Sequence, residues 1–335
     1  MKAGPLALTL GDPAGIGPEI VVKAWLELRK AGPPFLVVGD LQALASASPG
    51  GASILKAVLA PAEALDAFAD ALPILDLPLR SPVVAGQPSS AAAPAVIKWI
   101  ETAVGLALSG AVAGVVTAPI AKAPLYEAGF RFPGHTEFLG ELTAAESFEG
   151  ARGPVMMLTA GGLRVALVTV HAPLASVPGL ISVEAIVNAG MVTAQALRRD
   201  FGIGEPRLAV AALNPHAGEG GGIGREEIEI VAPAVRALQD LGVDATGPHP
   251  ADSLFPEAMR SRYDAAICLY HDQALIPVKM LDFWGGVNVT LGLPIVRTSP
   301  DHGTAFDIAG RGLARPDSLI AAIRLADELA RARAG

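Results

Sequence analysis

The chain has 335 residues, of which 51% are hydrophobic and 17% are charged, and its net charge is −8. This composition excludes an intrinsically disordered chain, and the acidic balance argues against a nucleic acid or an anionic membrane as partner. At this length one core rarely suffices, so two lobes are expected. Cys268 is the only cysteine and lies in an apolar run, which predicts a core thiol, no intrachain disulfide and no secretion.

No targeting segment is expected. Residues 5–10 are too short for the apolar core of a signal peptide and run directly into a glycine-rich loop. The uncharged stretch 102–121 is long enough to span a bilayer, but a Ser-Gly pair and Pro119 interrupt it. The pattern therefore predicts the end of a buried helix, a turn and a strand over residues 112–116. A soluble, cytoplasmic protein is the expectation.

The first structural unit combines a strand over residues 5–10, a glycine-rich loop over 11–17 and a helix to about residue 30. Pro18 suits the first helical turn, and Glu19 suits the positive end of the helix dipole. The loop lacks the glycine order of a Rossmann or P-loop motif. Its spacing alone leaves two interpretations open, a phosphate or cofactor contact and a plain strand-to-helix turn.

A second strand is expected at Phe35–Gly39, and the apolar stretch 43–86 has few side chains suited to chemistry. A helix over about 89–108 leads to the strand at 112–116. This alternation of strands and helices predicts an α/β fold with a largely parallel sheet that is covered on both faces.

The stretch 130–138 reads Phe-Arg-Phe-Pro-Gly-His-Thr-Glu-Phe and places three polar residues after a Pro-Gly turn. If their side chains point in one direction, His135, Thr136 and Glu137 would bind a substrate. A helix N-terminus capped by Thr136 is the alternative, and the sequence leaves both open.

Three of the six histidines follow the C-terminal end of an apolar strand. The strands and histidines are 163–170 with His171, 207–213 with His216, and 265–270 with His271. In open α/β sheets ligands bind at this edge, and three neutral imidazoles suit a divalent cation that keeps positions open for substrate or water. The long separations fix no distance, so ordinary polar residues at strand ends remain the alternative.

The loop after the second of these strands, residues 213–227, contains Asn-Pro-His and five glycines, and helical spacing follows over 226–241. Glycines let a ligand approach the backbone closely, and a passive surface turn would need neither His216 nor Glu219. A flexible turn is the competing interpretation.

The last third supplies groups for an anion. Lys279, Asn288 and Arg297 lie around the strand Val287–Leu291 in an otherwise apolar region, and together they would hold a phosphate monoester or a carboxylate. Solvated charges flanking a strand are the alternative. A second glycine-rich loop, residues 299–312, precedes the closing helix at 317–333.

Several motifs resemble those of the 4-hydroxythreonine-4-phosphate dehydrogenase family of pyridoxal phosphate biosynthesis. They are Gly-Asp-Pro-Ala-Gly-Ile-Gly-Pro-Glu, Gly-His-Thr-Glu-Phe, Asn-Pro-His-Ala-Gly-Glu-Gly-Gly, Pro-Ala-Asp-Ser-Leu-Phe, Tyr-His-Asp-Gln and Asn-Val-Thr-Leu-Gly-Leu-Pro-Ile-Val-Arg-Thr-Ser-Pro-Asp-His-Gly-Thr-Ala. The match runs from residue 6 to about 325. The first and last glycine loops also resemble those of isopropylmalate and isocitrate dehydrogenases, which bind a nicotinamide cofactor without a Rossmann motif.

The resemblance implies a two-lobed α/β/α fold with the active site in the cleft between the lobes, at a homodimer interface. One lobe would comprise residues 1–125 and 298–335, and the other residues 126–297. The glycine loops at the two chain ends should then meet in one lobe, with Gly15 near Gly303.

The resemblance also assigns residues. The ligands of one divalent cation per site (Zn²⁺, Mg²⁺ or Co²⁺), shared across the homodimer interface, would be His171, His216 and His271. The substrate contacts would be His135, Thr136, Lys279, Asn288 and Arg297. The adenosine end of NAD or NADP would lie against His302, Gly303, Thr304 and Asp307. No residue is assigned as the proton acceptor. Two departures from the family pattern are Ala121 and His249.

The implied reaction is the NAD(P)-dependent, metal-dependent oxidation of 4-phosphooxy-L-threonine. Its product, 2-amino-3-oxo-4-phosphooxybutanoate, would lose carbon dioxide to give 3-amino-2-oxopropyl phosphate. Similar enzymes act on 4-phosphothreonate, 4-phosphoerythronate or a cyclic dihydrodiol, and these substrates remain alternatives. A metal-dependent phosphatase is a further alternative, although the extra carboxylate ligands of two-metal sites are missing. A non-catalytic phosphate-binding protein would have no use for a cation with open positions.

Overall fold

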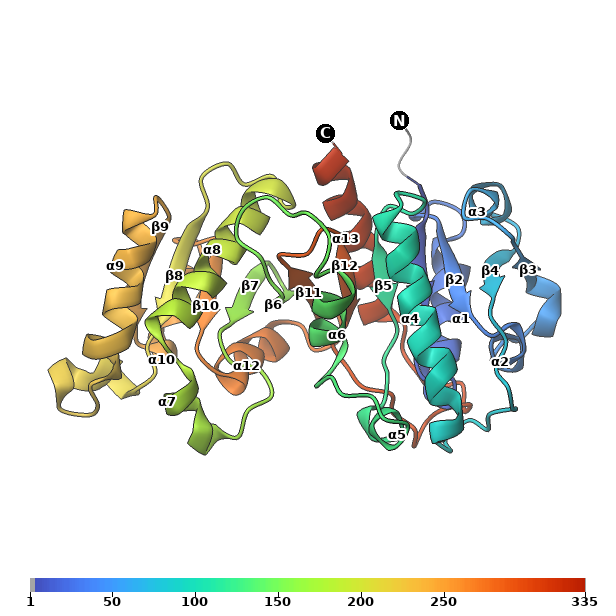
Figure 1. The fold of residues 1–335 in the computed structure, drawn as a ribbon, viewed down its shortest axis with the longest axis horizontal. Helices are drawn as coiled ribbons and strands as arrows, with labels where there is room; N and C mark the ends of the chain where they lie inside the picture. Colours follow the sequence, from blue (N-terminus) through green and yellow to red (C-terminus); the bar gives the residue numbers. More distant parts are fainter. Residues whose placement is uncertain (1–3, 335) are drawn as a thin grey trace. The chain divides into compact units, whose positions relative to one another are not determined.

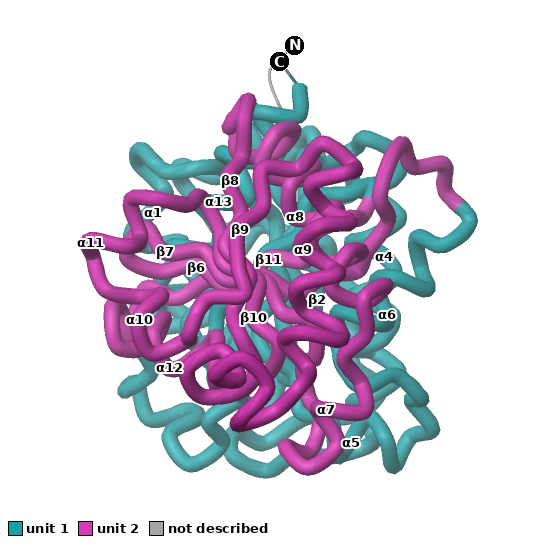
Figure 2. Tube along the Cα trace, turned by 90° about the vertical axis from the view of Figure 1, so that its left-hand side faces the viewer, with its two compact units in different colours: residues 1–145, 294–335 teal, residues 146–293 magenta. Residues whose placement is uncertain are grey.

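The computed structural model describes residues 4–334 (Figure 1) and contains two compact units (Figure 2). Unit 1 consists of Met1–Ala145 and Pro294–Gly335, and unit 2 of Glu146–Leu293. The sequence analysis placed these two boundaries at 125/126 and 297/298. The first differs because helix α6 (His135–Leu142) packs against α4 (Ala93–Leu108), which belongs to unit 1.

The strands of unit 1 are parallel throughout their observed pairings. In sheet order they are β3 (Leu55–Ala57), β4 (Leu72–Asp76), β2 (Phe35–Gly39), β1 (Leu6–Thr9), β5 (Val115–Thr117) and β12 (Arg297–Pro300). Strands β1 and β2 are buried at every residue, which explains their almost entirely apolar sequences, because helices cover both faces of such a sheet. The predicted parallel sheet is confirmed in this unit.

Helices α1 (Gly17–Leu28) and α4 cross the sheet of unit 1 in opposite directions, from β1 to β2 and from β4 back to β5. Right-handed crossovers therefore place them on opposite faces, and Figure 1 shows α4 in front of the strands. Helix α13 (Asp317–Ala334) packs against α1, β12 and β5. The other helical segments are α2 (Leu41–Ser46), η1 (Gly51–Ile54), α3 (Glu63–Ala67), η2 (Ser90–Ala92) and α5 (Lys122–Glu127).

The stretch Ser90–Leu108 is long and apolar enough to cross a membrane by length and composition. In the structure it packs against β1, β2 and β5, and Trp99 is fully buried there. The helix ends at Leu108 and the chain turns into β5, as the sequence predicted. Its apolar face is therefore the face that covers the sheet.

Unit 2 contains a mixed sheet. In order its strands are β11 (Val287–Leu291), β6 (Val155–Ala160), β7 (Leu163–Leu167), β10 (Ala265–Cys268), β8 (Arg207–Ala211) and β9 (Asp244–His249). The pairs β11 with β6 and β6 with β7 are antiparallel, whereas β7, β10, β8 and β9 run parallel. Strands β6 and β7 thus form a hairpin around Gly161 and Gly162, whereas the sequence analysis did not predict β9.

Helices pack on the strands of unit 2. Helix α8 (Val183–Arg199) contacts β6, β7, β8, β10 and β11, and the Ser182 hydroxyl caps it by accepting a hydrogen bond from Ala185 N. Helix α12 (His271–Leu281) contacts β6, β7 and β10, and Cys268 is buried in the core there, as predicted. The other helical segments are η3 (Leu174–Ser176), α7 (Val177–Leu180), η4 (Pro215–Gly221), η5 (Glu227–Val231), α9 (Ala232–Asp240), α10 (Ala251–Leu254) and α11 (Glu257–Arg260).

The two cofactor-like glycine loops lie together within unit 1. Ile16 N donates a hydrogen bond to Thr304 O at 2.9 Å. A Cβ added at Gly15 would lie 2.9 Å from the same carbonyl oxygen, so this contact requires glycine. The predicted meeting of the loops from the two chain ends is confirmed.

Candidate functional site

The strands that precede the three predicted metal ligands are neighbours in the order β7, β10, β8 and run in one direction. Their carboxyl ends are joined by side chains. Thr169 Oγ1, beyond β7, donates a hydrogen bond to Leu269 O beyond β10 at 2.7 Å. Gln273 accepts from Leu269 N and donates to Ala212 O beyond β8, each at 2.7 Å. His171, His271 and His216 therefore all follow one short, cross-linked edge of the sheet.

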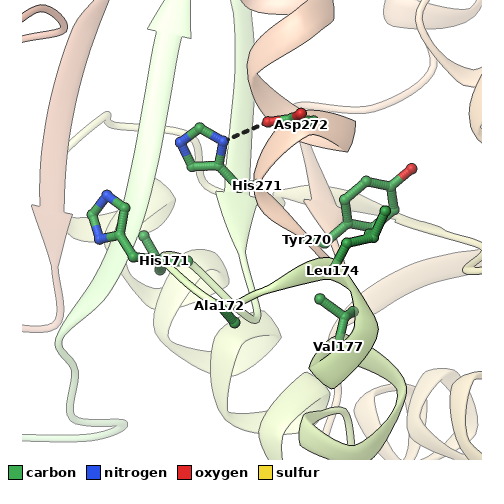
Figure 3. Close-up of a pocket in the computed structure, with 8 residues that line it drawn as sticks. His171, Ala172, Leu174, Val177, Tyr270, His271 and Asp272 are labelled. Atoms are coloured by element: carbon green, nitrogen blue, oxygen red, sulfur yellow. Dashed lines mark hydrogen bonds and ion pairs between the residues drawn. The ribbon is translucent and has the colours of Figure 1, made fainter.

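The structure brings His171 and His271 together. Their ring centroids lie 5.8 Å apart, beside a cavity of about 330 Å³ that both residues line (Figure 3). His271 Nδ1 lies 2.7 Å from the Asp272 carboxylate, and a carboxylate can only accept, so Nδ1 carries the proton. Nε2 is then the ring nitrogen that faces away from Asp272, and in Figure 3 it is on the side of the ring where His171 lies. Metal-binding histidines are commonly oriented by a carboxylate in this way.

His216 lies in an unusual left-handed turn after β8. Five successive residues, from His216 to Gly220, have φ between 47° and 76°, and three of them are not glycine. This conformation costs about 1–2 kcal/mol for each such residue, so neighbouring contacts must stabilise it. The His216 side chain is 70% exposed, and its Nδ1 lies 3.3 Å from Glu219 Oε2. The predicted helix over 226–241 begins instead with the π-helical segment η5, which α9 continues.

Within residues 4–334, the structure contains no group of three or more His, Cys, Asp or Glu side chains placed to hold a metal ion. The predicted triad is thus represented by the His171 and His271 pair, with His216 on the adjacent strand end. The assignment of all three to one cation stays a prediction.

Two predicted substrate residues, Lys279 and Asn288, lie in unit 2. Lys279 is on α12, and its Nζ lies 5.1 Å from the ring centre of Phe283. Asn288 is on β11, and its Oδ1 is buried without a hydrogen-bond partner. A buried amide oxygen of this kind is uncommon and indicates a place for a ligand or water.

Three further predicted substrate residues lie in unit 1. Arg297 begins β12, is 2% exposed, and donates a hydrogen bond from Nη2 to Thr117 Oγ1 at 2.6 Å. His135 and Thr136 open helix α6. The N-cap of this helix is Gly134, so the alternative interpretation of Thr136 as the capping residue is wrong.

The cationic groups around His135 shape its chemistry. Burial holds the pKa of its imidazole well below the ordinary value, and the charges of Arg297 and Lys122 act in the same direction. The ring is therefore neutral at pH 7, and its Nε2 is buried with no hydrogen-bond partner. Burial also lowers the pKa of Arg297 to about 9, an effect that Glu137 opposes. Two cationic side chains next to a ring nitrogen that has no hydrogen-bond partner are suited to binding an anion.

The predicted cofactor loop is held against the first helix of unit 1. Glu19 accepts hydrogen bonds from Ala314 N at 2.8 Å and from Gly312 N at 3.3 Å. Lys23 Nζ donates to the carbonyl oxygens of the same two residues, at 2.7 Å and 2.9 Å. The loop residues predicted to contact adenosine remain wholly or partly accessible: His302, Gly303, Thr304 and Asp307.

Comparison with known proteins decides the family. The sequence model of the pyridoxal phosphate biosynthetic protein PdxA matches residues 31–326. The chain belongs to the PdxA family. The resemblance found in the sequence motifs is thereby confirmed.

The relatives of this PdxA chain cover it almost completely. A protein from Caulobacter vibrioides named 4-hydroxythreonine-4-phosphate dehydrogenase is 70% identical over 333 residues, or 99% of each chain. The crystal structure of 4-hydroxythreonine-4-phosphate dehydrogenase from Klebsiella pneumoniae is 41% identical, with a TM-score of 0.84, and the match covers 98% of this chain and 100% of that one. A terephthalate 1,2-cis-dihydrodiol dehydrogenase from Burkholderia xenovorans is 31% identical, with a TM-score of 0.64 and 98% coverage of both chains.

Sequence reasoning missed some residues of this PdxA site. No role was assigned to Gln273 or Glu227, although both are buried polar residues that hold the strand ends and the His216 loop. The signal for Gln273 was its position two residues after His271, where an apolar stretch of the helix begins. For Glu227 it was a carboxylate among the apolar positions that follow a glycine-rich loop.

Proposed function

We propose that this chain is an NAD(P)-dependent 4-hydroxythreonine-4-phosphate dehydrogenase. It oxidises the C3 hydroxyl of 4-phosphooxy-L-threonine, and the 3-oxo product loses carbon dioxide to give 3-amino-2-oxopropyl phosphate. The observation that carries the proposal is the paired rings of His171 and His271 at a cross-linked strand edge, in a PdxA chain. In a phosphorylated hydroxy acid, the paired imidazoles would hold the cation that binds the hydroxyl group. The separate cationic cluster would bind the phosphate or the carboxylate.

We assign one divalent cation per site, Zn²⁺, Mg²⁺ or Co²⁺, to His171, His216 and His271. The donors fit such an ion. Two imidazoles that share a cation with metal–nitrogen distances of about 2.1 Å have ring centres roughly 5–6 Å apart, and the observed separation is 5.8 Å. Asp272 and Glu219 each lie on the Nδ1 side of a predicted ligand, which leaves Nε2 for the ion. When bound, the cation would lower the pKa of the hydroxyl and stabilise negative charge on its oxygen.

Arg297, Lys279 and Asn288, with His135 and Thr136, are the proposed substrate contacts. Guanidinium and ammonium groups attract phosphate and carboxylate oxygens, and the planar Arg297 can donate two parallel hydrogen bonds. The neutral His135 can donate or accept without adding another charge. Together these groups would fix the substrate in the orientation that hydride transfer needs.

We further propose a homodimer with shared active sites. Large apolar side chains are exposed on α12 and the loop that follows, namely Ile276 (63%), Met280 (81%), Phe283 (60%) and Trp284 (50%). Large apolar side chains exposed along one helix and the loop after it favour a protein partner. Lys279 lies among these residues and contacts Phe283. If a second copy of the chain covers this surface, Lys279 of one subunit would lie close to the active site of the other.

The nicotinamide cofactor, NAD or NADP, is assigned to the paired glycine loops of unit 1. Glycine at position 15 permits the backbone contact with Thr304, and the loop from residue 302 to residue 307 is the proposed adenosine contact. We also propose that the two compact units are the two lobes of the enzyme, and that it works in the cytoplasm on a small phosphorylated hydroxy amino acid.

The test is an NAD(P)H-formation assay with a panel of substrates. The metal-loaded enzyme is offered 4-phosphooxy-L-threonine, 4-phosphothreonate, 4-phosphoerythronate and a cyclic cis-dihydrodiol. We expect kcat/KM to be highest for the first, because 70% identity places the chain nearer to the 4-hydroxythreonine-4-phosphate dehydrogenases than the 31% identity of the dihydrodiol enzyme does. A clear preference for another member of the panel would overturn the substrate assignment.

A further inference from the structure

The left-handed turn from His216 to Gly220 depends on a buried carboxylate. Glu227 is 2% exposed and begins η5, immediately after the glycine-rich loop. Its Oε1 accepts hydrogen bonds from Leu213 N at 2.8 Å and Asn214 N at 2.7 Å. Its Oε2 accepts one from Asn214 Nδ2 at 2.9 Å. The two residues that lead into the Pro-His sequence are thus held by one side chain.

The same carboxylate also contacts the middle of the turn. A Cβ added at Gly218 would lie 2.6 Å from Glu227 Oε2 and 3.0 Å from Gly224 O, so only glycine fits there. Ile223 N donates a hydrogen bond to Gly218 O at 3.0 Å and closes the loop. Glu227 therefore holds the two residues before the turn by hydrogen bonds and lies close to its centre at Gly218, while His216 lies between these two points.

The exposed side of the turn presents His216 and Glu219. Their side chains are 70% and 63% exposed, and Nδ1 and Oε2 lie 3.3 Å apart. An exposed imidazole on a strained backbone holds one direction only if the backbone beneath it is fixed. Glu227 is the buried group that holds the backbone before the turn and leaves no room for a side chain at Gly218.

We propose that Glu227 is a positioning residue for the cation site, which fixes the direction of His216 by stabilising the left-handed turn. The proposal rests on the assignment of His216 as a cation ligand. Glu227 itself does not touch the cation in this account. Outer residues that orient metal ligands affect metal affinity by about 10-fold to 100-fold when they are changed.

The first experiment is Co²⁺ binding to the full-length, metal-free Glu227→Gln protein, followed by visible absorption. Glutamine keeps the shape, but if its oxygen faces the two backbone N–H groups, its NH₂ faces the NH₂ of Asn214, donor against donor. The matched control is Glu229→Gln, two residues further along, where the side chain is 57% exposed and pairs with Arg225. We expect Glu227→Gln to weaken Co²⁺ binding about 10-fold or more and to change the absorption bands, with Glu229→Gln unchanged.

A second pair of variants tests the contact without altering any charge. Gly218→Ala and Gly220→Ala introduce the same methyl group at similar φ values of +76° and +64°. Only the methyl at 218 meets Glu227, because nothing lies within 4 Å of a Cβ at 220. We expect Gly218→Ala to weaken Co²⁺ binding about 10-fold more than Gly220→Ala, even if Glu227→Gln fails to fold.

His216→Ala separates this proposal from the assignment on which it rests. If His216→Ala binds Co²⁺ with wild-type affinity and spectrum, the metal assignment itself is wrong. If His216→Ala loses affinity while Gly218→Ala and Gly220→Ala behave alike, His216 is a ligand and Glu227 does not position it. Wild-type binding and spectrum in a folded Glu227→Gln protein would overturn the positioning role in the same way.

Discussion

Replacement of Arg297 by methionine should remove activity and yet leave the fold as stable or more stable. The guanidinium is 2% exposed, and burial lowers its pKa from the ordinary value to about 9. At about 1.4 kcal/mol per pKa unit, the folded protein disfavours the charged form by a free energy on the order of 4–5 kcal/mol. Methionine matches the aliphatic part of the arginine side chain and avoids this penalty, whereas the lost hydrogen bond to Thr117, one of the interactions of Arg297, is worth about 1–3 kcal/mol.

The net effect expected for Arg297→Met is a free energy of unfolding that is unchanged or higher by about 1–3 kcal/mol. If Arg297 binds a phosphate or carboxylate with two charge-assisted hydrogen bonds, kcat/KM should fall at least about 100-fold. Urea unfolding and steady-state kinetics measure the two quantities. The control is Arg207→Met, which removes a largely exposed arginine paired with Asp264 and should leave kcat/KM near wild type.

Two outcomes would refute this reasoning. If Arg297→Met loses several kcal/mol of stability, the guanidinium holds the fold and its burial is already compensated. If the variant retains wild-type kcat/KM, Arg297 does not contact the substrate. The first result would refute the estimate of the burial penalty, and the second would remove the main anion-binding group from the proposed site.

Three further predictions concern protonation, subunit sharing and the cofactor. Because burial depresses the pKa of His135, the unfolded chain binds a proton below about pH 6.5 that the folded protein does not. The free energy of unfolding should then fall with decreasing pH by up to about 1.4 kcal/mol per pH unit, and His135→Gln should lose that slope in urea titrations. Mixing inactive His171→Ala and Lys279→Ala dimers should restore up to about one quarter of wild-type activity if subunits exchange freely, because half of the dimers are then mixed and half of their sites carry neither substitution. If verified exchange leaves the activity as low as that of the two starting variants, each subunit carries a complete site. Gly15→Ala would place a Cβ 2.9 Å from Thr304 O, so KM for NAD(P)⁺ should rise about tenfold or more, and an unchanged KM would separate these loops from the cofactor.

The sequence predicted much of the fold because its signals there are local. Strands β1 and β2 are almost entirely apolar runs, and the loop around Gly15 directly precedes Pro18 at the start of α1. The hairpin of β6 and β7 has its two glycines at the turn. The compact unit extends to Ala145 and not to the predicted residue 125 because α6 packs on α4, and packing between distant segments leaves no periodic signal.

The site was less accessible to sequence reasoning. Three histidines after three strands suggested a common edge, but only the strand order β7, β10, β8 makes those strands neighbours. The left-handed backbone at Ala217 has no sequence signal, since alanine does not favour positive φ. Asn288 resembled an ordinary residue of a strand, and only the three-dimensional structure reveals its buried, unpartnered oxygen.

The most direct measurement of the central claim is the ratio of carbon dioxide released to NAD(P)H formed from 4-phosphooxy-L-threonine, with and without a chelator. The account predicts one carbon dioxide per NAD(P)H, loss of both products in chelator and recovery of both with Zn²⁺, Co²⁺ or Mg²⁺. It also predicts that His271→Ala, which removes one ring of the observed pair, is not rescued by these ions. Undiminished NAD(P)H formation in chelator, by the wild type and by His271→Ala alike, would contradict it.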